Sequence, residues 1–108
     1  MRAIIAAAIV ALCGFAANPA AAKERQAQCK FVFEGKTIIN GRCNFESDPD
    51  GSFRMWDKKH TVYLNADGNN AEATWNRIPG SFHADSPVGA LTRKGACWVN
   101  DKTEICAK

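Results

Sequence analysis

Residues 94–108 read Lys94-Gly95-Ala96-Cys97-Trp98-Val99-Asn100-Asp101-Lys102-Thr103-Glu104-Ile105-Cys106-Ala107-Lys108. If Asp101-Lys102 forms the tip of a hairpin, Cys97 faces Cys106 and Trp98 faces Ile105. In a hairpin with a two-residue loop, this places the two cysteines at a close, non-hydrogen-bonded position that suits a disulfide. Trp98 and Ile105 then share the opposite face. The stretch therefore predicts a β-hairpin closed by a disulfide, and an all-β fold around it.

The start of the chain has the pattern of a secretory signal. One positive charge at Arg2 precedes an apolar run over residues 3–17, which is too short to span a bilayer and ends before the small residues 20–22. We expect cleavage after Ala22, which gives a signal peptide at 1–22 and a single disulfide-bonded β-domain at 23–108. No second apolar run follows, so no membrane span is expected in the mature chain. The predicted destination is the periplasm or the medium.

Cysteines are expected to stabilise this small domain. Cleavage would remove Cys13 and leave Cys29, Cys43, Cys97 and Cys106, an even number that predicts two disulfides in an exported chain. Four cysteines allow three pairings, and strand register favours the two local ones, Cys29–Cys43 and Cys97–Cys106. Such bridges matter because a domain of this size is near the lower limit for a self-sufficient core.

The first predicted hairpin contains the other cysteine pair. Apolar residues alternate with polar ones over 29–33 and again over 39–45, which is the period of a half-buried strand. If residues 35–37 form the loop, Cys29 faces Cys43 directly, and both cysteines share a face with the apolar side chains. The polar segment 23–28 before this hairpin is expected to be a loose terminus.

Further short strands follow at close spacing. Residues 82–89 are rich in turn formers and are expected to be irregular. A helix over 70–77 is the alternative to the strand expected at 71–75. Seven or eight strands without a long helix predict a small antiparallel sandwich or barrel of hairpins. The remaining predicted strands cover residues 52–56, 61–66, 71–75 and 90–93.

Residues 46–57 match a calcium-binding loop in part. Acids or other oxygen ligands occupy several ligand positions from Glu46 to Asp57, but Arg54 stands at a ligand position and the flanks resemble strands rather than helices. An ordinary acidic turn is the preferred interpretation. The two histidines, His60 and His83, and the cysteine spacings give no zinc pattern. No metal and no cofactor are therefore expected.

A small hydrolase is one functional hypothesis. His83 and Asp85 place a base two residues from an acid, and Ser81 or Ser86 is a possible nucleophile. Such residues in a polar loop are more often turn formers, so no catalytic residue is assigned. This hypothesis requires a pocket that brings His83 and Asp85 within hydrogen-bonding distance of a nucleophile.

The aromatic residues suggest a binding surface instead. Most of the large rings are expected in the core. Trp56 is off the face that Phe53 and Met55 share and lies beside charged residues, so it is the ring most expected to be exposed. The candidate contact residues are Trp56, Phe82, His83 and Arg93.

Charge gives little support for nucleic-acid binding. The chain has 14 Lys+Arg against 11 Asp+Glu, a formal net charge of +3. The cations are scattered, with Lys58-Lys59 and Arg93-Lys94 as adjacent pairs, and they form no basic stripe of the kind that binds a phosphate backbone. The expected partner is a protein or another component of the cell envelope.

Five short motifs stand out in the sequence, namely Asp50-Gly51-Ser52-Phe53, Trp75-Asn76, His83-Ala84, Gly95-Ala96-Cys97-Trp98-Val99-Asn100 and Ile105-Cys106-Ala107. On these motifs, the chain resembles a group of small exported proteins of unknown function from alphaproteobacteria. That group brings no activity with it, so the resemblance implies only a small exported protein. The leading hypothesis is a non-enzymatic binding module of the cell envelope, and the alternative is a secreted effector- or inhibitor-like factor that acts on host or competitor cells.

Overall fold

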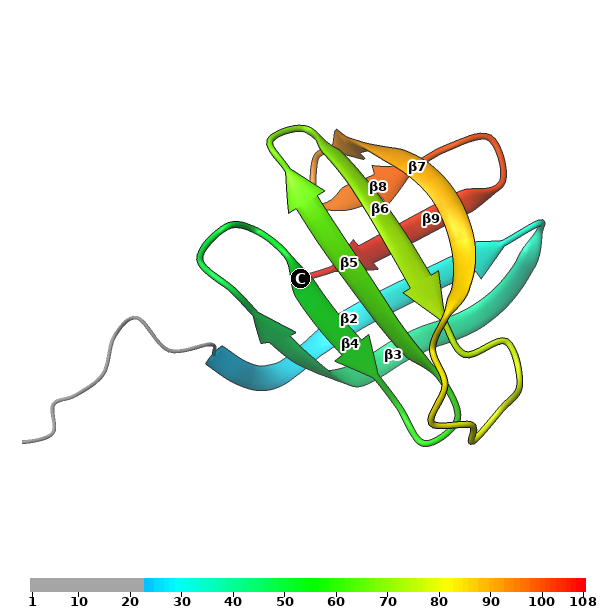
Figure 1. Cartoon of the computed structure of the whole chain (residues 1–108). Coiled ribbons are helices and arrows are strands. Elements are labelled where there is room, and N and C mark those ends of the chain that lie inside the picture. The colour runs from blue at the N-terminus through cyan, green and yellow to red at the C-terminus, as the bar shows by residue number, and fades with distance from the viewer. Residues whose placement is uncertain (1–22) are drawn as a thin grey trace, which may run out of the picture.

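A computed structural model describes residues 23–108, in which eight antiparallel strands form a closed barrel (Figure 1). Each strand pairs with its neighbour in sequence, and β2 also pairs with β9 to close the barrel. The strands are β2 (Lys23–Phe33), β3 (Lys36–Ser47), β4 (Phe53–Trp56), β5 (Thr61–Asp67), β6 (Asn70–Trp75), β7 (Ser86–Lys94), β8 (Cys97–Val99) and β9 (Thr103–Ala107). The expected all-β fold is confirmed, as a barrel rather than a sandwich.

The predicted signal peptide and Cys13 lie in residues 1–22, outside the described residues. Within 23–108, no helix has the length and hydropathy needed to cross a membrane.

The hairpin of β8 and β9 has the predicted register. Cys97 pairs with Cys106, Trp98 pairs with Ile105, and the two cysteines form a disulfide with their Cα atoms 4.1 Å apart. Trp98 and Ile105 point into the core, where they are 3% and 0% exposed. The alternation of faces along a strand therefore places the disulfide on the outer wall and the two large apolar side chains inside.

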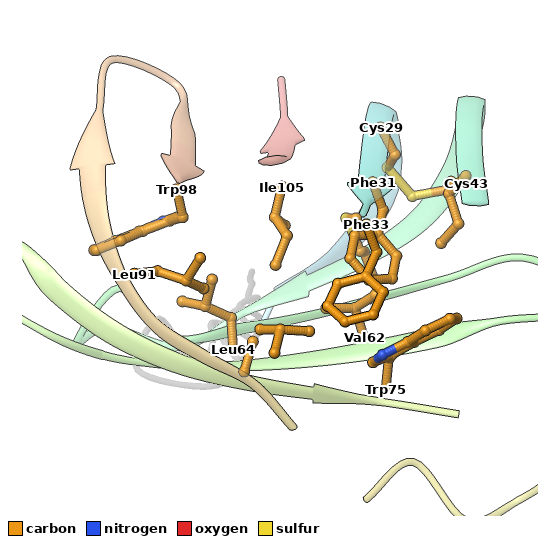
Figure 2. Close-up of a cluster of buried hydrophobic side chains, with 14 of the residues drawn as sticks. Cys29, Phe31, Phe33, Cys43, Val62, Leu64, Trp75, Leu91, Trp98 and Ile105 are labelled. Atoms are coloured by element: carbon orange, nitrogen blue, oxygen red, sulfur yellow. A yellow bond between two sulfur atoms is a disulfide. The ribbon is translucent and has the colours of Figure 1, made fainter. Parts of the chain in front are cut away.

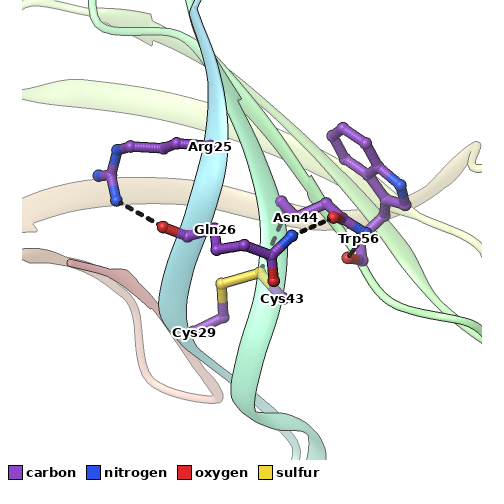
Figure 3. Close-up of a disulfide and its surroundings, with 6 residues drawn as sticks. All are labelled: Arg25, Gln26, Cys29, Cys43, Asn44 and Trp56. Atoms are coloured by element: carbon purple, nitrogen blue, oxygen red, sulfur yellow. Dashed lines mark hydrogen bonds between the residues drawn. A yellow bond between two sulfur atoms is a disulfide. The ribbon is translucent and has the colours of Figure 1, made fainter.

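The hairpin of β2 and β3 keeps the predicted disulfide but not the predicted register. Its turn is Glu34-Gly35 rather than residues 35–37, and both turn residues have positive φ (53° and 81°), as a two-residue type I′ turn requires. The two-residue turn, together with an irregularity in the ladder between Phe31 and Val32, pairs Cys29 with Gly41 rather than with Cys43. Because the shift is two residues, Cys43 stays on the same face, and the cysteines bond diagonally with their Cα atoms 5.9 Å apart (Figure 3).

The segment 23–28 is strand, so the prediction of a loose terminus is wrong. Ala27 pairs with Cys43 and is 5% exposed, and the Gln26 side-chain amide donates a hydrogen bond to the Asn44 side chain (2.5 Å). Ala27, which points inward, and the hydrogen-bonded side chains of Gln26 and Asn44 on the outer face extend the hairpin. The polar composition of this segment hid that pattern.

The hairpin of β5 and β6 has the predicted pairs, and the helical alternative over 70–77 does not form. Val62 pairs with Trp75 and Leu64 pairs with Ala73, although the loop is only Gly68-Asn69 because Asp67 already pairs with Asn70. The irregular segment expected at 82–89 is only partly irregular, because β7 begins at Ser86. A register shift beside Pro87 lets the ladder include a residue without a backbone N–H.

Large side chains fill the barrel interior (Figure 2). Phe31 is fully buried and meets Trp75 edge to face, with the ring centroids 5.0 Å apart. Leu91 and Trp98 occupy the other side of the same core. An eight-stranded barrel is just wide enough for such packing. The candidate contact residues must therefore be sought on the rims and the outer wall.

Chain connections alternate between two rims because consecutive strands are antiparallel. One rim has the turns between β3 and β4, β5 and β6, and β7 and β8. The other, here called the long-loop rim, has residues 34–35, 57–60, 76–85 and 100–102. Backbone hydrogen bonds join these connections, from Gly80 N–H to the Lys59 carbonyl (2.8 Å) and from Glu34 N–H to the Lys102 carbonyl (2.7 Å).

Loss of the Cys29–Cys43 bridge is expected to lower the free energy of unfolding by about 3 kcal/mol, because the crosslink restricts the unfolded chain. Urea denaturation of a variant with both cysteines replaced by Ser measures this effect. Oxidised protein should also show no alkylation of Cys29, Cys43, Cys97 or Cys106 before reductant is added. Labelling of these cysteines without reductant, or an unchanged urea midpoint, would contradict the assignment.

Candidate interaction surface

The longest connection of the long-loop rim exposes two large apolar side chains. Phe82 is 101% exposed and Ile78 is 71% exposed. Between them, Ile78-Pro79-Gly80-Ser81 forms a tight turn, in which the Ser81 N–H donates to the Ile78 carbonyl (3.1 Å) and Gly80 has φ 81°. Proline and glycine at the two central positions are typical of a type II turn. We call the side chains of Ile78 and Phe82 the apolar tip.

A buried asparagine fixes this turn to the barrel. Asn76 is 1% exposed, and its Oδ1 accepts a hydrogen bond from the Thr61 N–H (2.6 Å). Its Nδ2 lies within hydrogen-bonding distance of the carbonyl oxygens of Lys59 (2.8 Å), Ile78 (3.2 Å) and Ser81 (3.1 Å). One side chain thus joins the start of β5, the 57–60 connection and the turn that presents the apolar tip.

The 57–60 connection lies against the turn and adds two cations. The Asp57 carboxylate accepts hydrogen bonds from the backbone N–H groups of Lys59 (2.9 Å) and His60 (2.8 Å), so it organises its own turn. Lys58 and Lys59 are exposed. Because the Lys59 carbonyl accepts from Gly80, this basic pair is attached directly to the base of the apolar tip.

Arg77 covers the end of the core beneath the tip. Its guanidinium carbon lies 5.5 Å from the ring centroid of Phe33 and 5.7 Å from that of Trp75, within the range of cation–π contacts. The His60 ring lies 5.7 Å from the Trp75 ring. Arg77 is nevertheless exposed, so it presents a third cation next to the apolar tip.

Phe82 and His83 are both exposed on this loop, as a contact surface requires. Trp56 ends β4 just before the 57–60 connection, but it is half-buried rather than fully exposed. The Arg54 guanidinium lies 3.9 Å from its ring centroid and also forms an ion pair with Glu46 (3.3 Å). Figure 3 shows Trp56 on the barrel wall, where its carbonyl accepts from the Asn44 amide.

Arg93 does not join the other candidates. It lies near the end of β7, and its backbone N–H donates to the Asn69 carbonyl in the turn between β5 and β6 (2.9 Å). Its guanidinium lies 5.4 Å from the Trp98 ring centroid. This is the rim opposite the long-loop rim, so Arg93 cannot share one compact contact with Phe82.

The geometry expected for a hydrolase is not seen among the described residues. The Ser81 hydroxyl accepts a hydrogen bond from the backbone N–H of His83 (3.1 Å), which is a turn contact. No hydrogen bond in residues 23–108 joins the His83 imidazole to Asp85, Ser81 or Ser86.

The acidic segment 46–57 is divided by β4. Glu46 pairs with Arg54, and the Asp50 carboxylate accepts from the Ser52 N–H (2.8 Å). Asp57 lies beyond the strand, on the other rim. Asp57 therefore lies apart from the acidic residues of the 46–50 segment.

Comparison with protein-family models, curated proteins and solved structures gives no match to this chain. The sequence analysis proposed Phe82 and His83, which are exposed, but it named neither exposed Ile78 nor buried Asn76 as a candidate. The only local signal for Ile78 was that a large apolar residue stands beside Pro79-Gly80-Ser81. Asn76 stands in the Trp75-Asn76 motif, but the pattern did not indicate its role as an anchor, because two of its partners, Lys59 and Thr61, are distant in sequence.

Proposed function

We propose that this protein is an exported, oxidised, non-enzymatic binding module that contacts its partner through the apolar tip, Ile78 and Phe82. The observation that carries the proposal is the complete exposure of Phe82 on a loop fixed to the barrel by buried Asn76. Exposed apolar side chains that form a contiguous patch mark interaction sites, whereas isolated ones are ordinary on protein surfaces.

The fixed conformation of the loop supports binding. A flexible loop must lose conformational entropy when it binds, whereas a loop already held in one conformation avoids most of that cost. Here four contacts of Asn76 and the hydrogen bond from Gly80 to Lys59 hold the turn in place. The two disulfides support export, because such bonds form and persist outside the reducing cytoplasm.

Site-specific photocrosslinking in cells of the source organism tests the proposal. With p-benzoylphenylalanine in place of Phe82, irradiation is expected to give discrete adducts with protein or lipid. The matched control carries the same group in place of Tyr63, an aromatic residue that is 42% exposed on the outer face of β5. Adducts at 82 that exceed those at 63 support the tip as the contact surface. Equal or absent adducts at the two positions would refute it.

A further inference from the structure

The geometry points to an anionic lipid bilayer surface as the partner of the apolar tip. In this arrangement Ile78 and Phe82 enter the interfacial region, and Lys58, Lys59 and Arg77 contact lipid phosphates. The inference rests on the proposed function and names its partner. It draws on the shape of the tip and on the charges around it.

The cations lie where a membrane contact would need them. Lys59 is bonded through its backbone to the turn of the tip, and Arg77 immediately precedes Ile78. The two connections, 57–60 and 77–85, carry these three cations against two carboxylates, Asp57 and Asp85. The Asp57 carboxylate already accepts two backbone N–H groups, so it is turned toward its own loop. Apolar side chains flanked by Lys and Arg are the pattern of interfacial membrane binding.

The charge balance of the whole rim is mixed, so the attraction is local. The other two connections of the long-loop rim contribute Glu34, Asp101 and Lys102. Glu34 and Lys102 are linked through their backbones. The cations attached to the tip are Lys59, whose carbonyl accepts from the Gly80 N–H, its neighbour Lys58, and Arg77, which precedes Ile78.

A bilayer fits the tip better than a protein pocket does. A stable protein interface buries about 800 Å² on each partner around an apolar centre. The tip offers two projecting apolar side chains. A lipid surface needs no matching concavity, because headgroups and acyl chains move apart around inserted side chains.

Sedimentation with sucrose-loaded vesicles tests this inference. Residues 23–108 contain all eight strands, the core and both disulfides, so the oxidised segment 23–108 is the protein used. It should bind vesicles of phosphatidylglycerol and phosphatidylcholine but bind pure phosphatidylcholine at least about tenfold more weakly. Raising the salt from about 0.05 to 0.5 M should weaken the binding, because exposed charges are screened over a few ångströms at high ionic strength.

Matched variants assign the contact to the tip. The double variant Ile78→Ser/Phe82→Ser should lower the partition coefficient by about tenfold or more, because it removes the apolar groups that would leave water. Lys58→Gln and Lys59→Gln should each lower it by about fivefold. Tyr63→Ser, on the barrel wall, and Lys94→Gln, at the opposite rim, should leave it unchanged. Circular dichroism checks that each variant keeps its fold.

The outcomes separate this inference from the proposed function. No binding to phosphatidylglycerol vesicles, or binding that Ile78→Ser/Phe82→Ser leaves intact, overturns the bilayer inference. If photocrosslinking at position 82 then gives a protein adduct, the binding module stands with a protein partner. If position 82 gives no adduct either, both proposals fail.

Discussion

The variant Asn76→Ala is expected to lose about 4 kcal/mol of unfolding free energy, a fall in Tm of roughly 20 °C for a domain of this size. The substitution removes an amide whose atoms contact one backbone N–H and three carbonyl oxygens while 1% exposed. The Thr61 N–H and the Ser81 carbonyl would lose the partner that the structure shows, whereas the Lys59 and Ile78 carbonyls would still accept from the Gly80 and Ser81 N–H groups. Each buried group left without a partner costs about 1 to 3 kcal/mol unless water takes the place of the amide. Urea denaturation measures the loss.

A second measurement separates local from global effects. In Asn76→Ala, the amide hydrogens of Gly80 and Ser81 should exchange faster with solvent than those of β8 and β9, because the turn loses its anchor. The control is Asn65→Ala, which replaces an exposed asparagine on β5 and should change stability by less than about 0.5 kcal/mol. A loss below about 1 kcal/mol in Asn76→Ala would show that its hydrogen bonds do not fix the loop.

The variant Phe31→Ala is expected to lose about 3 to 5 kcal/mol, because it empties a site at the centre of a filled barrel. Phe31 is 0% exposed, and its ring lies 5.0 Å from the Trp75 ring and 6.3 Å from the Phe33 ring. Closed strand pairing around the barrel limits how far the neighbouring side chains can collapse into the space. The urea midpoint and the Tm report this loss.

The chain contains a matched control for that variant. Phe82→Ala deletes the same ring from a fully exposed position, and stability should change by less than about 0.5 kcal/mol. Phe31→Leu keeps most of the buried volume and should cost only about 1 kcal/mol. Equal effects of Phe31→Ala and Phe82→Ala would contradict the assignment of one ring to the core and the other to the tip.

The sequence predicted those parts of the fold in which two independent patterns agree. For the hairpin of β8 and β9, the two-residue period and the cysteine spacing indicate one register, and that register is observed. For β5 and β6, the predicted register places apolar residues opposite each other, Val62 with Trp75 and Leu64 with Ala73. This register is also observed. Both signals come from neighbouring segments, where side-chain alternation alone decides the pairing.

Predictions were wrong where one local conformation changes the register. Glu34 adopts positive φ, which a non-glycine residue rarely does, and this shortens the first turn. The shorter turn and the irregularity in the ladder between Phe31 and Val32 together shift the pairing of Cys29 by two residues. At Pro87, a shift in the ladder lets a strand form where turn residues predict a loop. The sequence analysis named Phe82 but not Ile78 of the apolar tip. One reason is that Asn76, which anchors the tip, acts through tertiary contacts, and these leave no period in the sequence.

The order of the strands also bears on how the chain folds. Seven of the strand pairings join neighbours in sequence, and only the pairing of β2 with β9 joins distant segments. Each disulfide lies within a single hairpin. The entropic cost of closing a long loop therefore arises in one step, the docking of β9 on β2. The hairpins and their native cysteine pairs can form locally. A nascent chain with this topology can oxidise correctly before the barrel closes, which limits the time during which mispaired cysteines compete.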